Sequence, residues 1–194
     1  MKIDKAILEK AAMCKFVDPI TGLPPQDEIS LSALLSIYHQ QGRIGWNKVQ
    51  LLMPYCTDST TIASEVLKPS GSFSSEYPLF WRTNEELNAR GGMRPDFIYI
   101  SPDLRIVALI ENKIGANDTH KDDSYGGQFG RYIKYLMESN IAEPYMILIT
   151  SQFFLSKSPP WYATELQHAV NIQQSEGKIK TRIIVWEDIL EAFS

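Results

Sequence analysis

Three ionisable residues stand out because of their types and their places in the sequence: Asp96, Glu111 and Lys113. Each lies at the end of a short apolar run, and the turn-forming residues 101–103 (Ser-Pro-Asp) separate the two runs. Two carboxylates held close together repel each other unless a cation lies between them. Oxygen ligands of this kind suit Mg²⁺ or Mn²⁺, which use few carboxylates and keep sites for water and a substrate phosphate. The three residues therefore predict a divalent-metal site with a lysine next to metal-bound water.

The elements that must position these residues are two strands, predicted over residues 97–100 and 106–110. Both runs are rich in β-branched and aromatic residues, which favour strand over helix. If Asp96 faces Glu111 across an antiparallel pair, residues 102–105 remain for the loop, which is a common hairpin length. The sequence therefore predicts a β-hairpin.

Side chains alternate along a strand, so Glu111 and Lys113 share the face of Asp96 while Asn112 points away. Three ionisable groups then converge at one end of an otherwise apolar pair of strands. One interpretation is a catalytic metal site. The structural alternative is a salt bridge at the end of a sheet, with no chemical role.

Pro95-Asp96 followed by Glu111-x-Lys113 resembles the motif of the PD-(D/E)xK phosphodiesterases, the restriction-endonuclease-like superfamily. The E-x-K part ends a nearly continuous apolar strand, as a central strand covered on both faces requires. The resemblance extends over roughly residues 60 to 190. It implies an α/β fold with a three-layer α/β/α core and a mixed sheet.

Further positions resemble other parts of that superfamily. Gln128 and Tyr132 are similar to the Gln-x-x-x-Tyr helix that follows the catalytic strand in many members. Glu65 is similar to the acid on the helix before the core, and Glu76 and Glu85 are rival candidates for that role. In the superfamily, the glutamine and tyrosine line the active site or steer the lysine, although Tyr132 could equally be a core aromatic residue.

The resemblance implies a metal-dependent nuclease that hydrolyses DNA phosphodiester bonds and leaves a 5′-phosphate. Asp96, Glu111 and the backbone carbonyl of Asn112 would hold Mg²⁺ or Mn²⁺, and Glu65 would bind through water or a second ion. Lys113 would orient or deprotonate the attacking water. Restriction, repair, recombination and phage defence all use this scaffold. The alternative function is a catalytically inactive member that binds nucleic acid or a protein partner.

Arginines near the predicted site are candidates for substrate binding. Arg90 and Arg94 flank two glycines, where backbone without side chains can approach a phosphate while the guanidiniums hold it. Arg131 lies beside Tyr132 on the predicted helix, and we include both as candidates. A loop that is simply charged is the alternative interpretation for the first pair.

The composition is that of an ordinary globular protein: 194 residues, 44% hydrophobic, 22% charged and a formal net charge of −4. The negative charge does not favour nucleic-acid binding over the whole surface, so phosphate contacts would depend on local Lys and Arg. No apolar run approaches the roughly 20 residues of a membrane span, and we expect a cytoplasmic protein. Nothing fits the phosphate-binding loop G-x-x-x-x-G-K-[ST], so no nucleotide cofactor is expected. DNA is the expected partner, and a homodimer is plausible for double-strand cutting.

The predicted organisation is a helical N-terminal region, residues 1–58, packed on a nuclease-like core, residues 59–194, to form one compact domain overall. Helical periodicity marks Ser30 to His39 and a shorter amphipathic stretch from Trp46 to Met53. The other predicted elements are helices over 59–68, 125–139, 159–174 and 187–193, and strands over 77–82, 145–150 and 181–186.

Overall fold

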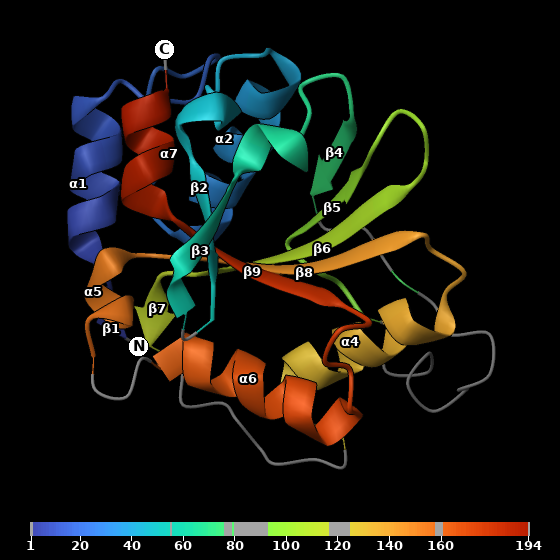
Figure 1. Ribbon diagram of the computed structural model, residues 1–194. Helices are drawn as coiled ribbons and strands as arrows, with labels where there is room; N and C mark the ends of the chain where they lie inside the picture. Colours follow the sequence, from blue (N-terminus) through green and yellow to red (C-terminus); the bar gives the residue numbers. More distant parts are fainter. Residues whose placement is uncertain are drawn as a thin grey trace.

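The computed structural model of the chain describes residues 2–54, 56–75, 79, 93–116, 125–157 and 161–193. It is an α/β structure with a seven-stranded mixed sheet and helices against both of its faces (Figure 1). The strands are β1 (Lys2–Ile3), β2 (Gln50–Met53), β3 (Cys56–Ile62), β4 (Ser72–Ser75), β5 (Phe97–Ile100), β6 (Ile106–Lys113), β7 (Gly115–Ala116), β8 (Glu143–Thr150) and β9 (Lys180–Val185). The helices are α1 (Lys5–Met13), α2 (Glu28–Gln40), α4 (Gly127–Glu138), α5 (Gln152–Leu155), α6 (Trp161–Gln173) and α7 (Trp186–Ala192), with the 3-10 helices η1 (Trp46–Lys48) and η2 (Ala63–Glu65).

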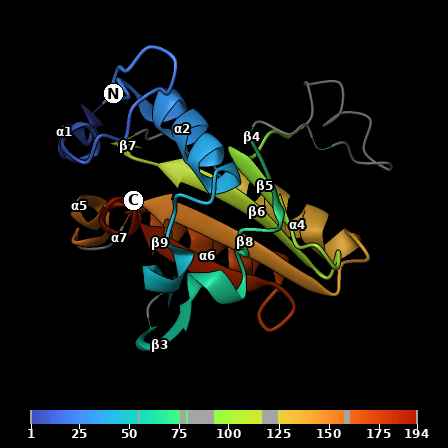
Figure 2. The ribbon, with the colours of Figure 1, turned by 90° about the horizontal axis from the view of Figure 1, so that it is seen from above.

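The strands of the large sheet lie in the order β3-β2-β9-β8-β6-β5-β4. The central strands β6, β8 and β9 are parallel, and the flanking strands join them antiparallel. The connections between the parallel strands place α4 and α6 on one face, opposite α2 (Figure 2). Ligands of open α/β sheets bind beyond the carboxyl ends of the parallel strands, and β6 ends at Lys113.

The hairpin that the sequence predicts is confirmed, including its register. Ile98 of β5 lies opposite Leu109 of β6. The same register, continued by two residues, places Asp96 opposite Glu111. The loop between the strands spans residues 101–105, close to the expected four residues.

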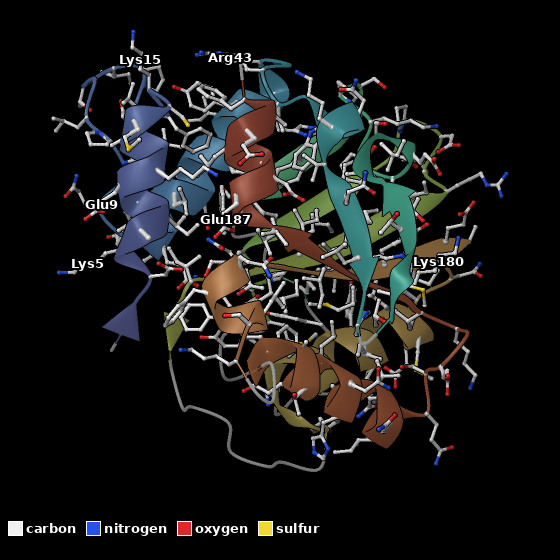
Figure 3. The ribbon with its side chains drawn as sticks, turned by 60° about the vertical axis from the view of Figure 1, so that its left-hand side comes forward. Lys5, Glu9, Lys15, Arg43, Lys180 and Glu187 are labelled. Carbon is white, nitrogen blue, oxygen red and sulfur yellow. The ribbon has the colours of Figure 1, made fainter. Side chains whose placement is uncertain are left out.

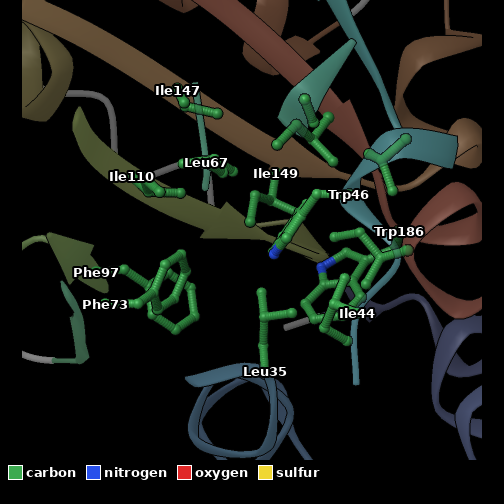
Figure 4. Packing of buried hydrophobic residues seen from close by; sticks show 14 of the residues in the cluster. Leu35, Ile44, Trp46, Leu67, Phe73, Phe97, Ile110, Ile147, Ile149 and Trp186 are labelled. Carbon is green, nitrogen blue, oxygen red and sulfur yellow. The ribbon is translucent and has the colours of Figure 1, made fainter. Parts of the chain in front are cut away.

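The side chains of β6 alternate between two hydrophobic clusters, one on each face of the sheet. Ala108 and Ile110 pack in the cluster under α2 and α7, whereas Leu109 packs in the cluster under α4 and α6. Figure 4 shows part of the first cluster, to which α2 contributes Leu35 and α7 contributes Trp186. Because the strand is buried on both faces, its sequence is almost continuously apolar.

Helix α2 begins with a capping box. The Asp27 carboxylate accepts a hydrogen bond from the Ser30 N–H (2.7 Å), and the Ser30 hydroxyl accepts one from the Asp27 N–H (3.1 Å). This cap fixes Glu28 in the first turn of the helix. The apolar stripe predicted for this helix is buried: Leu31, Leu34, Leu35 and Tyr38.

The helix predicted over residues 59–68 is wrong. Most of this segment is the strand β3, followed by the short turn η2. β3 pairs with β2, with Leu51 opposite Thr61. A run rich in threonine fits a half-buried strand once a partner is present, and this pairing outweighs the local cap-like residues Ser59 and Thr60.

The N-terminal region is less uniformly helical than predicted. The segment from Trp46 to Met53 forms only η1 before β2 begins, and β2 joins the large sheet by pairing with β9. The predicted boundary between residues 58 and 59 therefore falls inside β3. Ile7 of α1 and Ile147 of β8 belong to the same hydrophobic cluster, so both parts of the chain share one core.

The elements after β6 match their predictions closely: α4, β8, α6, β9 and α7 lie within a few residues of the expected ranges. The strand predicted over 77–82 lies outside the described residues except for Leu79, which forms a bridge with Met93. Helix α1 lies beside α7, and Figure 3 shows its Lys5 and Glu9 side chains projecting away from the rest of the molecule.

Gly130 in α4 gives a first testable prediction. A Cβ at this position would overlap the backbone carbonyl oxygen of Tyr125, which cannot move without shifting the start of the helix. We therefore expect Gly130→Ala to lower the free energy of unfolding by about 2–3 kcal/mol, although alanine normally favours helix. Chemical denaturation measures this, and an unchanged or higher unfolding midpoint would contradict the packing. Gly177→Ala separates the two costs: no atom lies within 4 Å of a Cβ there, but its φ of +76° is unfavourable for alanine, so it measures backbone strain without a steric clash.

Candidate active site

The structure brings Asp96, Glu111 and Lys113 together at the end of the hairpin. The Lys113 ammonium donates to Glu111 Oε1 (2.6 Å), and the Asn112 N–H donates to Asp96 Oδ2 (2.6 Å). Glu111 is buried, with 2% of its surface exposed, whereas Asp96 is half-buried. The register of two strands therefore places two acids and an amine in one cluster, as the sequence predicts.

Helix α4 adds Gln128 and Tyr132 to this cluster. Gln128 Nε2 donates to Glu111 Oε1 (2.8 Å) and lies 3.0 Å from the hydroxyl oxygen of Tyr132. The two residues are four apart, so they lie on the same side of the helix. Tyr132 is buried, and burial, followed by the negative charge of Glu111, raises its pKa above the ordinary value. It is therefore both a core aromatic residue and a neighbour of the site.

A third acid, Glu28, lies in the cluster. It comes from α2, a helix for which the sequence predicted no site residue. The carboxylate of Glu28, in the first turn of α2, is close enough for Lys113 and Asp96 to change its pKa. Burial is the largest effect and raises this pKa to about 7. The backbone N–H groups of Ile114 and Gly115 donate toward the carboxylate and lower the pKa in part. The available signal was the Asp-x-x-Ser capping pattern, which places residue 28 at the start of a helix.

Glu65, the predicted additional acid, lies elsewhere. It is in the turn η2, after the edge strand β3, and this turn lies beside η1. The charges that act on the Glu111 carboxyl are those of Lys113 and Asp96. The same two residues, Lys113 and Asp96, act on the carboxyl of Glu28, so Glu28 and not Glu65 shares the electrostatic environment of Glu111. The rivals Glu76 and Glu85 lie outside the described residues.

Burial and the neighbouring charges shift the pKa values of the ionisable groups in the cluster in opposing directions. Burial raises the pKa of Glu111 to about 7, although the Lys113 ammonium opposes this shift. Burial alone would lower the pKa of Lys113, but attraction to Glu111 and to the other two acids outweighs it and raises the pKa. Lys113 is therefore a fixed positive charge at neutral pH, surrounded by acids that resist full ionisation.

The arginines predicted to bind substrate are Arg90, Arg94 and Arg131, and the structure describes two of them. Arg94 is exposed, two residues before Asp96. Arg131 is half-buried on α4, and its charge acts on Tyr132. Arg90 lies outside the described residues.

The chemistry of the donor set fits a divalent cation. Glu111 Oε2 is buried and has no hydrogen-bond partner, which is costly for an ionised carboxylate oxygen and leaves it able to bind a cation or a proton. Within the described ranges, no three His, Cys, Asp or Glu side chains are grouped closely enough to hold a metal unaided. Mg²⁺ commonly binds through one or two carboxylates and completes its shell with water and phosphate, so a partial protein site is sufficient.

Comparisons of the chain with protein-family models, curated protein sequences and solved structures gave no match. The described part of the chain also contains no helix with the length and apolar character needed to cross a bilayer. Any statement about function therefore depends on the geometry of the site.

Proposed function

We propose that this protein is a metal-dependent nuclease that hydrolyses phosphodiester bonds of DNA, with a restriction-endonuclease-like three-layer core of the PD-(D/E)xK type. The observation that carries the proposal is the convergence of Asp96, Glu111 and Lys113 at the carboxyl end of a central strand. Two features outside the motif support it: Gln128 contacts Glu111, and an acid from α2, Glu28, lies in the same cluster.

In this proposal Asp96, Glu111 and the backbone carbonyl of Asn112 hold the cation, with Glu28 as the additional acid. A bound Mg²⁺ or Mn²⁺ would lower the pKa of a water molecule and stabilise negative charge on the phosphate. Gln128 keeps Glu111 oriented through its 2.8 Å hydrogen bond. This division of roles leaves the unpaired Glu111 Oε2 for the cation.

Lys113 supplies positive charge to the reacting phosphate. In the metal-free protein the surrounding acids raise the pKa of Lys113 and keep it protonated, which supports this role. A preorganised charge in a partly buried site stabilises a developing negative charge better than solvent does. The Lys113 side chain is 22% exposed, so a substrate phosphate has access to it.

DNA contacts would come from arginines around the cluster, since the net charge of the chain is −4. Arg94 and Arg131 flank it from the start of β5 and from α4, and Arg90 completes the predicted set. Phosphate contacts of this kind make binding strongly dependent on salt.

The proposal is tested by incubating the purified protein with supercoiled, linear and single-stranded DNA in Mg²⁺ or Mn²⁺. We expect cleavage of at least one substrate, new ends that carry a 5′-phosphate, and loss of cleavage with EDTA. Glu111→Gln is the matched control, because it keeps the shape and the possibility of contacts to Lys113 and Gln128. Cleavage that persists in EDTA or in Glu111→Gln would contradict the proposal.

The raised pKa values predict how metal affinity changes with pH. Glu28 and Glu111 each have a pKa of about 7, so below that pH a bound proton competes with the cation. We expect the affinity for Mn²⁺ to rise as pH increases from 5.5 to 8 and to level off above, with about one proton released per acid at pH 6. Calorimetric titrations in buffers of different ionisation enthalpy measure both quantities. Affinity that is flat over this range would contradict the assignment of these two acids to the metal site.

The ion pair between Lys113 and Glu111 favours one second candidate. Without a cation, this 2.6 Å contact neutralises much of the negative charge of Glu111. That is expected for a superfamily member that binds nucleic acid or a protein but does not cut. Calorimetry with Mn²⁺ separates the two candidates. Micromolar binding supports the nuclease, and no binding together with retained DNA affinity supports the inactive member.

A further inference from the structure

The side chain of Asn112 lies between two site residues in the sequence but on the opposite face of β6. It is completely buried, with 0% of its surface exposed. Its Nδ2 donates to the Ser32 hydroxyl (2.8 Å) and, more weakly, to the Glu28 carbonyl oxygen (3.4 Å). Its Oδ1 accepts from Trp186 Nε1 (2.6 Å). The amide therefore bonds to α2 on one side and to α7 on the other.

These partners fix the orientation of the amide. Exchanging its nitrogen and oxygen would set an acceptor against the Glu28 carbonyl oxygen and a donor against the Trp186 N–H. Trp186 is itself fully buried in the cluster shown in Figure 4, so its N–H cannot turn to solvent. The amide is thus a rigid connection between the catalytic strand and the first two turns of α2.

Glu28 is attached at two points to β6 and to the residues that follow it. Its main-chain carbonyl oxygen accepts a weak hydrogen bond from the Asn112 amide, and its carboxylate accepts from the N–H groups of Ile114 and Gly115. We propose that the Asn112 side chain is a positioning group. It fixes the position of α2 along the direction of β6 and thereby keeps the Glu28 carboxylate near Asp96 and Lys113. The value of this position for metal binding rests on the proposed function, whereas the attachment itself does not.

A buried amide that is simply satisfied by its neighbours would give the same contacts, so the test needs a matched pair. Ser32 and Ser36 lie one turn apart on α2, and each is 6% exposed. Ser36 donates to the Phe73 carbonyl oxygen (3.3 Å) and has no part in the Asn112 connection. Replacing each serine with alanine removes one buried hydroxyl from the same helix, but only Ser32→Ala removes a partner of Asn112.

The experiment measures hydrogen exchange of the Ile114 and Gly115 amides by NMR in metal-free protein, and then the affinity for Mn²⁺ by calorimetry. In Ser32→Ala we expect exchange of both amides to accelerate about tenfold and the affinity to fall three- to tenfold, because the carboxylate that they bind is no longer held in place. In Ser36→Ala we expect neither change, although its loss of thermal stability should be similar to that of Ser32→Ala. Ser32→Thr, which keeps a hydroxyl, should restore the slow exchange.

Equal exchange of the two amides in Ser32→Ala and Ser36→Ala would overturn the positioning role. A wild-type protein that binds no Mn²⁺ would overturn the proposed function instead. The exchange measurement would still decide the positioning role in that case, so the two failures are distinguishable.

Discussion

Replacing Lys113 with alanine is expected to reduce Mg²⁺-dependent DNA cleavage by about a hundred- to a thousandfold. The loss follows from removing a preorganised positive charge from the place where negative charge develops, an effect of about 10²–10³ for a single group in comparable sites. Asp96→Ala should have a similar effect, because this acid shares the cluster and is anchored by the Asn112 N–H at 2.6 Å. Cleavage rates under single-turnover conditions measure both variants.

The Lys113 variant should remain folded. Its partner Glu111 has a pKa of about 7 and can take up a proton when the ammonium is lost, so no isolated charge stays buried. Lys180→Ala is the matched control: it removes the lysine of β9 that forms an ion pair with Glu143 of β8 (2.9 Å), and it should leave cleavage unchanged. Activity near the wild-type level in both Lys113→Ala and Asp96→Ala would exclude this site.

The second large effect is expected at Glu28. We predict that Glu28→Gln weakens Mn²⁺ binding by about ten- to a hundredfold and lowers cleavage at least as much, as is typical when a group that supports a metal site is lost. Glu65→Gln should change the affinity and the cleavage rate less than about twofold, because Glu65 lies in η2, beside η1 and outside the cluster. Calorimetry and cleavage assays on the two variants measure the difference. The reverse order of effects would show that the acid has been assigned to the wrong helix.

Stability provides an internal control for Glu28→Gln. The pKa of Glu28 is raised in the folded state, so ionising it costs stability as pH rises from its ordinary value of 4.5 through about 7. Above that range the neutral glutamine removes this cost, and we expect the metal-free variant to be at least as stable as the wild type at pH 8. Lower activity together with equal or higher stability identifies a functional rather than a structural acid.

The hairpin was predictable because its signals are local. Two short runs of β-branched and aromatic residues, joined by a Ser-Pro-Asp turn, define both the strands and the loop length. The loop length then fixes the register, and the alternation of side chains places Asp96 beside Glu111. The same reasoning found α4, where Gln128 and Tyr132 lie four residues apart on one helical face.

The two errors, the helix over 59–68 and the choice of Glu65, have different causes. Residues 59–62 were predicted to start a helix, but they belong to β3, which exists because β2 supplies its hydrogen bonds. Glu65 is predicted because it is similar to the acid on the helix before the core in the superfamily. A resemblance of this kind does not fix which residues lie close together in space, and Glu65 lies in η2, beside η1.

The sequence by itself determined the chemistry of the hairpin: which acids and which amine share one face, and that a glutamine helix follows them. Only the tertiary structure decided which acid joins them and how it is held. Glu28 is 83 positions before Glu111, and no periodicity or turn signal connects residues at such a separation. Their proximity results from packing α2 against the sheet and from the bonds of the buried Asn112 amide to Ser32 and Trp186.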